Sequence, residues 1–515
     1  MRIGSEIRLT LLNWFVKIAL NRTTKAFFLL SVLFCFAQGI IQSFLYSVDT
    51  RWHGFTSSVV SFADIDGKIF LQYTLHDTWE ICSHSPVAGG VPDACVPFYT
   101  AGEPASIPPG FRRDNSDNNA ARTCLSGAEL TGLSLSGVPN SNGTATITLV
   151  QQRPPGQECK LDTVCTRTIL YPNEKLRQAI REDASLIALQ FWLLGVAIFA
   201  IISESIPHLI ALAFARLLSV GWSSYTIWRT LSLGSRIAKL IGNPGTPCQL
   251  GVFPPYISQR VAFQIADVVL HSVAFVWTLI LSWNLIQVYL RTTFRRIGPP
   301  KAIVVIYRYF TTVLVGLQLS AFFLVVAIGL WIDQLMNSAL KNISSHTKVY
   351  QAASISTVLL LIPWIAMGWF AVRHEMRRPM IAFLATSGLF ISMWSLMFYS
   401  QVYRFSFIDW PFFGCLTCTS FVVMIVSVVF GVICWRNFGG GLAHYLHADN
   451  ALRSSSFEPE LFVHEAEKAG TSASRADRRI ILKLDIDSLS SSDELPPYKS
   501  SIESFALDSK GDGRL

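Results

Sequence analysis

Five polar side chains recur inside one long apolar stretch, residues 261–289. They are Gln264, Asp267, His271, Thr278 and Ser282. In an α-helix all five fall within an arc of about 60°, because successive residues turn by about 100°. Asp267 and His271 stand one turn apart and can interact directly. Ionisable groups at this depth indicate a site for an ion, a proton or a small ligand; the alternative is a stripe of hydrogen bonds that joins helices.

Arg216 is another ionisable group in the middle of an apolar stretch, residues 205–228. A central Arg costs about 2.5–3.5 kcal/mol on insertion scales, and the surrounding apolar and small residues must absorb that cost. Asp267 is a candidate partner, although the depths estimated for the two side chains differ by several ångströms. Arg216 therefore joins the candidate intramembrane polar site, and its pairing with Asp267 is a hypothesis.

Membrane-spanning helices are the elements that must position these residues. Hydrophobic residues make up 51% of the chain and charged residues 15%, whereas a soluble domain carries about 25% charged residues. A spanning helix needs roughly 20 mostly apolar residues. Eight stretches qualify: 26–48, 185–203, 205–228, 261–289, 303–332, 351–372, 379–400 and 413–435. The sequence predicts an all-α polytopic membrane protein, with about eight transmembrane helices and a small disulfide-containing, partly β extracellular domain.

The distribution of Lys and Arg favours eight spans with a cytoplasmic N-terminus. Inner segments then hold fourteen basic residues and short outer loops seven. Without a span at 205–228 the later loops invert, and the counts become twelve and nine. Because basic residues concentrate on the cytoplasmic side of membranes, the eight-span topology is preferred. The outer segment 229–260 goes against this trend with four basic residues.

Cysteines cluster between the first two apolar stretches. A single polar segment holds Cys82, Cys95, Cys124, Cys159 and Cys165. Cys248 lies in a later loop on the same side of the predicted topology and makes the number even. This clustering indicates disulfides in an oxidising compartment, and the six cysteines allow fifteen pairings. The segment is either a ligand-sensing domain or a glycosylated loop that is held by disulfide bonds.

Local patterns add detail to this segment. Residues 68–75 and 145–150 have the composition of β-strands, 101–143 that of a loop, and 173–184 that of a helix capped by Asn173. The glycosylation sequons at Asn142 and Asn342 both fall on the outer side of the predicted topology.

The predicted organisation has five parts. Residues 1–25 form a cytoplasmic N-terminus, 26–48 an uncleaved signal anchor, 49–184 the extracellular or lumenal domain, and 185–435 a seven-helix bundle. Residues 436–515 form a polar, largely disordered cytoplasmic tail. The tail contains an acidic Ser cluster and Leu495-Pro-Pro-Tyr, which are candidate sites for phosphorylation and for tail-binding proteins. Cys434, at the inner membrane face, is a candidate for palmitoylation.

Motifs for catalysis are missing from the sequence. There is no G-x-S-x-G nucleophile motif and no P-loop, and His444 and His447 have no evident third metal ligand. We therefore expect no catalytic residues, no metal and no cofactor. The net charge of +8 reflects basic clusters beside apolar stretches and does not form a nucleic-acid patch.

Several stretches resemble a family of uncharacterised multipass membrane proteins from mushroom-forming fungi. The likeness lies in Ala188-Leu-Gln-Phe-Trp-Leu, Glu204-Ser-Ile-Pro-His-Leu-Ile, Leu330-Trp-Ile-Asp-Gln-Leu, Ile362-Pro-Trp, Gly368-Trp-Phe-Ala-Val-Arg and Asn437-Phe-Gly-Gly-Gly-Leu-Ala-His-Tyr-Leu. It covers most of residues 169–452, and the ectodomain and tail match poorly. The family often has Lys where Gly440 stands here. The resemblance implies an ectodomain and a seven-helix bundle, and no known activity.

These features favour a receptor- or sensor-like membrane protein without catalysis. One alternative is a transporter or channel that uses the polar stripe in 261–289, and another is a membrane interaction scaffold. The expected partners are the lipid bilayer, an extracellular ligand and cytoplasmic proteins that bind the tail, with no nucleic acid. The plasma membrane is the expected location, with another membrane of the secretory pathway as the alternative.

Overall fold

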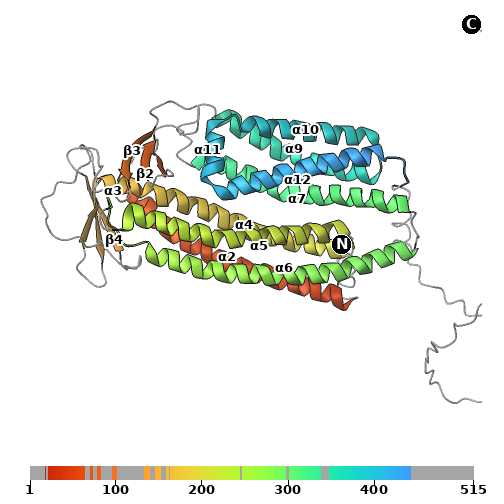
Figure 1. The fold of residues 1–515 in the computed structure, drawn as a ribbon, viewed down its shortest axis with the longest axis horizontal. Coiled ribbons are helices and arrows are strands. Elements are labelled where there is room, and N and C mark those ends of the chain that lie inside the picture. The colour runs from red at the N-terminus through yellow and green to blue at the C-terminus, as the bar shows by residue number, and fades with distance from the viewer. Residues whose placement is uncertain are drawn as a thin grey trace, which may run out of the picture. The chain divides into compact units, whose positions relative to one another are not determined.

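The fold comes from a computed structural model (Figure 1). It describes residues 18, 21–63, 70–73, 78–82, 95–100, 133–139, 145–151, 158–161, 163–243, 246–296, 301–337, 347–441 and 443. The predicted sequons at Asn142 and Asn342, and Cys124, lie outside the described residues, as do residues 444–515 of the predicted tail.

Eight helices are long and apolar enough to cross a membrane, so the chain is a multipass membrane protein. They are α2 (Arg22–Phe62), α4 (Leu170–Ile202), α5 (Ile206–Ile237), α6 (Pro254–Arg296), α7 (Lys301–Asn337), α9 (Thr347–Arg373), α10 (Arg377–Met397) and α12 (Pro411–Arg436). The short helices α3 (Thr163–Thr168) and α11 (Gln401–Asp409) precede α4 and α12. All eight predicted spans are confirmed, including the stretch around Arg216.

Local sequence explains where several helices begin and turn. The Asn21 side chain accepts a hydrogen bond from the Thr23 amide and caps α2. Prolines stand at the start of α5 and α12, where a missing amide proton costs no helical hydrogen bond. The tight turns that follow α4 and α9 place Glu204 and Glu375 at positive φ. Such turns force neighbouring helices to run antiparallel.

The helices extend well beyond the predicted spans. α2 continues past residue 48 to Phe62, and α4 begins at Leu170 rather than near residue 185. Forty-one residues of α2 correspond to about 60 Å at about 1.5 Å per residue, twice the thickness of the hydrocarbon core. Asn173 therefore lies inside α4 instead of capping it, and its side chain accepts a hydrogen bond from Thr56 of α2.

The long helices pack as two groups of four (Figure 1). The first group contains α2, α4, α5 and α6, and α2 packs against both α4 and α6. The second group contains α7, α9, α10 and α12, and α7 also contacts α4 and α5 of the first group. The first group includes α2, the helix that the sequence predicted as a signal anchor; its role as an anchor and the separate seven-helix bundle stay predictions.

Two antiparallel three-stranded sheets lie between α2 and α4 in the chain. The first contains β1 (Phe70–Tyr73), β2 (Thr78–Cys82) and β3 (Cys95–Thr100), and the second β4 (Leu133–Pro139), β5 (Ala145–Gln151) and β6 (Glu158–Leu161). Strands were predicted at 68–75 and 145–150 and are confirmed, while β4 lies within the predicted loop 101–143. Trp79 of β2 is fully buried and packs edge-on against Tyr171, which fixes the first sheet to α4.

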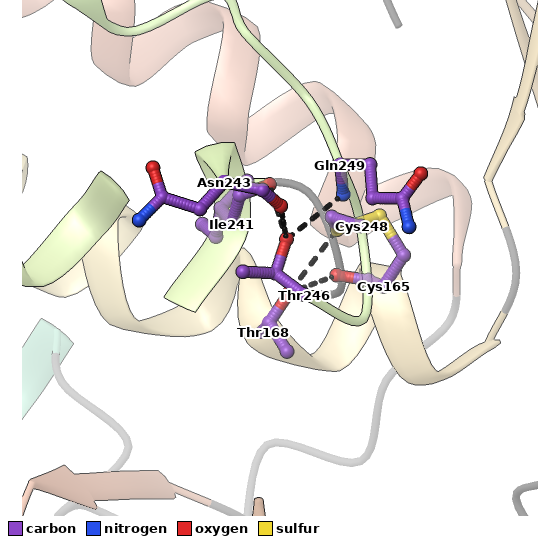
Figure 2. The surroundings of a disulfide bond; sticks show 7 residues. All are labelled: Cys165, Thr168, Ile241, Asn243, Thr246, Cys248 and Gln249. Carbon is purple, nitrogen blue, oxygen red and sulfur yellow. Dashed lines mark hydrogen bonds between the residues drawn. A yellow bond between two sulfur atoms is a disulfide. The ribbon is translucent and has the colours of Figure 1, made fainter. Parts of the chain in front are cut away.

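Disulfides define one face of the helices. Cys82 and Cys95 join β2 to β3, and Cys165 of α3 is bonded to Cys248 in the segment between α5 and α6. Figure 2 shows the second bond beside Thr168, whose hydroxyl lies 3.2 Å from the Cys248 sulfur. We call the face that carries these bonds the outer face, and the face where α2 begins the inner face.

Candidate functional site

The predicted polar stripe lies on the side of α6 that faces the other helices. Gln264, Asp267, His271, Thr278 and Ser282 are all buried. Apolar residues on the opposite side of the same helix are exposed at the surface that contacts lipid. The helical spacing of the five residues thus predicted their common orientation.

Asp267 is the centre of a hydrogen-bond network between three helices. Its carboxylate accepts a hydrogen bond from the Gln42 amide of α2 at 2.8 Å and another from the Ser223 hydroxyl of α5. The Nε2 atom of His271 lies 3.6 Å from the same carboxylate. The network holds a single acid between polar groups from each neighbour, an arrangement that suits a proton or small cation.

Arg216 does not pair with Asp267, so that hypothesis is wrong. Its Nη1 atom donates a hydrogen bond at 3.0 Å to the side-chain oxygen of Gln190 on α4. No ion pair joins Arg216 to Asp267 among the described side chains. Asp267 lies one to two turns nearer the outer face, where Gln42 and Ser223 occupy its oxygens.

Several polar atoms in this interior have no hydrogen-bond partner within the described part of the protein. Both polar atoms of Gln38 belong to this set, as do one atom each of Gln190, Gln264 and His271. All four side chains are buried. Buried donors and acceptors without a partner are costly, so a cluster of them suits bound water or a small polar guest.

A layer of charged side chains lies at the outer end of the same four helices. Arg260 of α6 forms an ion pair with Asp49 of α2 and lies 3.7 Å from Asp183 of α4. These three side chains are at most 4% exposed. The Tyr256 hydroxyl also donates a hydrogen bond to Asp49 at 3.0 Å. The layer therefore places the Arg260 guanidinium between carboxylates from two other helices, and one oxygen of Asp183 is buried without a hydrogen-bond partner among the described residues.

Glu182 of α4 forms the second buried ion pair of this layer. Arg229 of α5 donates hydrogen bonds to both carboxylate oxygens of Glu182, at 2.8 and 2.7 Å. The indole of Trp222 donates a third at 2.8 Å. Both Arg229 hydrogen bonds come from its Nη2 atom, and together with the indole they hold α4 and α5 in register.

A cavity of about 630 Å³ opens at this charged layer. It lies between β1, the outer ends of α4, α5 and α6, and the segment from α11 to the start of α12. Its charged lining consists of Lys175, Glu182, Arg229, Arg236, Arg260 and Asp409. Aromatic residues line the remaining wall: Tyr73, Tyr171, Tyr225, Trp228, Tyr256, Phe405 and Trp410. Arg260 pairs with Asp49 and lies against Asp183, so these four cations meet four acids and the layer has no formal surplus of charge.

Asp409 connects α11 to this cavity. Lys175 forms an ion pair with its carboxylate at 2.7 Å, and Gln178 donates a hydrogen bond to it at 2.8 Å. Burial raises the pKa of Asp409, but Lys175, Gln178 and Arg236 outweigh that effect, so the net pKa lies below its ordinary value. The carboxylate therefore stays ionised at neutral pH.

The sequence predicted the polar stripe and missed the charged cavity. Arg229, Arg236 and Arg260 were counted as loop charges because they follow or precede the apolar stretches. The sequence did contain one signal for this site. Glu182 and Asp183 stand just before the apolar part of α4, at the same outer level as these Arg residues, and are therefore candidate partners for them.

The remaining predicted sites have separate locations. Of the six disulfide candidates, four form the two bonds given above; the side chain of Cys159 is not among those described. Cys434 is buried in the core of the helix groups. Palmitoylation there, which stays a prediction, would require the thiol to leave that packing.

Comparison of the chain with protein-family models, with curated proteins and with solved structures finds no match. Any function must therefore be inferred from the geometry of the two polar sites.

Proposed function

We propose that this protein is a membrane receptor or sensor that binds a small organic anion in the outer cavity. The observation that supports the proposal is the guanidinium of Arg236, which has no ion-pair partner among the described residues, in a cavity with aromatic walls. Its volume of about 630 Å³ falls within the range of about 300–1,000 Å³ that is typical of small-molecule sites. Aromatic walls with a few fixed charges favour a flat, anionic ligand such as an aromatic carboxylate.

Arg236 is the side chain best placed to bind such an anion. Its guanidinium lies over the ring of Tyr73, 5.2 Å from the centroid. Among the described residues it has no ion-pair partner, whereas Lys175, Arg229 and Arg260 each pair with an acid. A ligand held by Arg236 would touch the first sheet, α5 and the segment after α11, and could thereby report its presence to both helix groups.

Ligand-induced stabilisation of the purified protein tests this proposal. Benzoate, indole-3-acetate and inorganic phosphate serve as probes, and a probe at about 100 times its Kd should stabilise the protein by about 2.7 kcal/mol. We expect an aromatic carboxylate to raise Tm, and Arg236→Gln to abolish the rise. Arg51→Gln, an exposed position on α2, is the matched control. No rise with any probe, or a rise that survives Arg236→Gln, contradicts the proposal.

The assignment of the outer face to the extracellular or lumenal side is part of the proposal. It is supported by the disulfides, which persist in oxidising compartments. Glycosylation at Asn142 and Asn342, residence in the plasma membrane and membership of the fungal membrane protein family are proposed with it.

A transporter is the second candidate, and the interior network around Asp267 favours it. Polar residues continue along α6 from Arg260 through Gln264 to His271, so a polar path leads from the outer cavity to the middle of the helices. Proton or cation flux in proteoliposomes that is lost in Asp267→Asn, with normal folding, would favour transport. Ligand binding without any flux would favour sensing.

A further inference from the structure

A second cavity, of about 830 Å³, lies between the two helix groups near the inner face. Its walls come from the inner halves of α4, α5, α7 and α9. They are mainly apolar and include Trp192, Val196, Phe310, Leu314, Ala321 and Ile365. This composition differs from that of the charged outer cavity and indicates a hydrocarbon ligand.

The rim of the inner cavity opens toward the hydrocarbon of the membrane. Phe199 is 54% exposed, Ile362 73% and Phe370 49%. These residues belong to membrane-spanning helices, so their exposed surfaces contact lipid tails. An acyl chain can therefore enter sideways from the bilayer without crossing water.

The length of the cavity matches one leaflet. Its lining on α9 runs from Arg373 at the inner end to Ile362, eleven positions earlier in the chain, which corresponds to about 16 Å at about 1.5 Å per residue. The lining from Trp192 of α4 to Ser203, the residue just after that helix, has the same length. Half of the hydrocarbon core measures about 15 Å, so the cavity spans the depth that one acyl chain occupies.

The inner end of the cavity is polar. Arg373 ends α9, lies over the ring of Trp369 at 4.9 Å, and has no ion-pair partner among the described residues. His208 and Ser205, at the start of α5, hydrogen-bond to each other at 2.7 Å and line the same end. Glu204 also lines this end, but no ion pair joins it to Arg373 among the described residues, so the guanidinium can bind a phosphate group at the level of the headgroups.

We infer that the inner cavity binds one acyl chain of a phospholipid from the inner leaflet, with the phosphate of that lipid at Arg373. The lipid would fill the contact between the two helix groups on this side, where α4 and α9 have no extensive contact with each other. The site is independent of the anion cavity, because the two share no lining residue.

Gly195 provides a direct way to block the site. It lines the cavity, and a Cβ added there would meet no atom within 4 Å, so Gly195→Phe projects into the cavity without a clash at its base. Gly388 of α10 is equally open and lies outside the cavity, which makes Gly388→Phe the matched control. Both substitutions leave the backbone free of strain, because neither glycine has a positive φ.

Photo-crosslinking in vesicles of phosphatidylcholine and phosphatidylglycerol tests the inference, with phosphatidylglycerol carrying a diazirine in the middle of one acyl chain. We expect labelled peptides from the lining of α4 and α9, strong loss of this label in Gly195→Phe, and unchanged label in Gly388→Phe. Arg373→Gln should lower the label roughly fivefold, the effect of about 1 kcal/mol per basic side chain at a membrane surface.

Two results would overturn the inference. Equal labelling of the lining in wild type and Gly195→Phe would place the lipid elsewhere. A diazirine-bearing free fatty acid that labels the same peptides, when the phospholipid does not, would exclude the phosphate anchor. Size-exclusion profiles that match the wild type show that each variant is folded.

Discussion

The buried ion pairs at the outer face predict that substitution of Arg260 destabilises the protein. Its side chain is 4% exposed, and those of its partners Asp49 and Asp183 are 0% and 3% exposed. Arg260→Gln leaves both carboxylates buried without their cation. Removing one partner of a buried pair costs about 3–5 kcal/mol, because the remaining charge stays desolvated.

The expected loss can be measured as a change in Tm of the protein purified in detergent. Domains of about 150–250 residues lose about 2–4 °C per kcal/mol, and the lower figure suits this longer chain. We therefore expect Arg260→Gln to lower Tm by about 6–10 °C, measured by tryptophan fluorescence. Arg51→Gln, on the exposed side of α2, should change Tm by about 1 °C at most.

A double-mutant cycle separates the lost ion pair from other effects of the substitution. Adding Asp49→Asn to Arg260→Gln removes one of the stranded charges, so the double variant should melt above the single one. Contacting residues typically show coupling of about 0.5–3 kcal/mol. A Tm for Arg260→Gln within about 2 °C of wild type, or losses that simply add, would refute a buried, mutually compensated charge layer.

Three further changes test packing and electrostatics elsewhere. Gly316→Ala should destabilise the α7–α12 contact by about 1–3 kcal/mol, because its Cβ would clash with the Ser427 hydroxyl oxygen. Ser387→Ala should cost about 1–3 kcal/mol, because it leaves the fully buried Trp364 indole without its 2.7 Å acceptor. Asp409→Asn should lower Tm at neutral pH, and this difference should shrink below about pH 4. All three are followed by thermal unfolding.

The pH effect at Asp409 follows from the direction of its pKa. Its folded pKa lies below the ordinary value. Its stabilising effect is therefore fully present above the unfolded pKa of about 3.9 and is lost as pH falls through the folded pKa. A difference between wild type and Asp409→Asn that grows on acidification would contradict this.

Two neighbouring positions serve as controls for packing. Gly329→Ala adds a Cβ that meets nothing within 4 Å, so it should leave Tm nearly unchanged. Ser392→Ala removes an exposed hydroxyl from α10 and should do the same. Losses equal to those of Gly316→Ala and Ser387→Ala would show that the predicted contacts are not specific.

Most of the fold could be predicted from the lengths of the apolar stretches and from the helical periodicity of their polar residues. Eight apolar stretches became eight helices, since only a helix satisfies every backbone group in hydrocarbon. The spacing from Gln264 to Ser282 gave the buried side of α6, because the helical repeat fixes which residues share a side. The span around Arg216 also holds, as Gln190 supplies a buried partner for the charge.

Partners across helices could not be read from the sequence. Whether Asp267 meets Arg216 or Ser223 depends on the relative shift and rotation of α5 and α6, which tertiary packing sets. The same holds for the excess of basic residues in 229–260, which went against the positive-inside trend. Arg229 and Arg260 pair with buried acids, so they act as interior charges and not as loop charges.

The ectodomain was only partly predictable. Alternating residues identified β5, whereas β4 lies in a segment rich in Ser and Gly, and its strand pairs with β5 through backbone hydrogen bonds. Cysteine spacing alone allowed fifteen pairings, and the bond from Cys165 to Cys248 spans two membrane helices. Such a bond follows from the fold and not from local sequence.

Peptide mapping of the unreduced protein from native membranes tests the eight-helix topology most directly. Free thiols are alkylated before digestion, and the peptides are identified by mass spectrometry. With α4 and α5 both crossing the membrane and the outer face in an oxidising compartment, Cys165 and Cys248 should appear as one cross-linked, unalkylated species. Recovery of both residues as separate alkylated peptides would contradict that topology, and with it the outer cavity on which the proposed function rests.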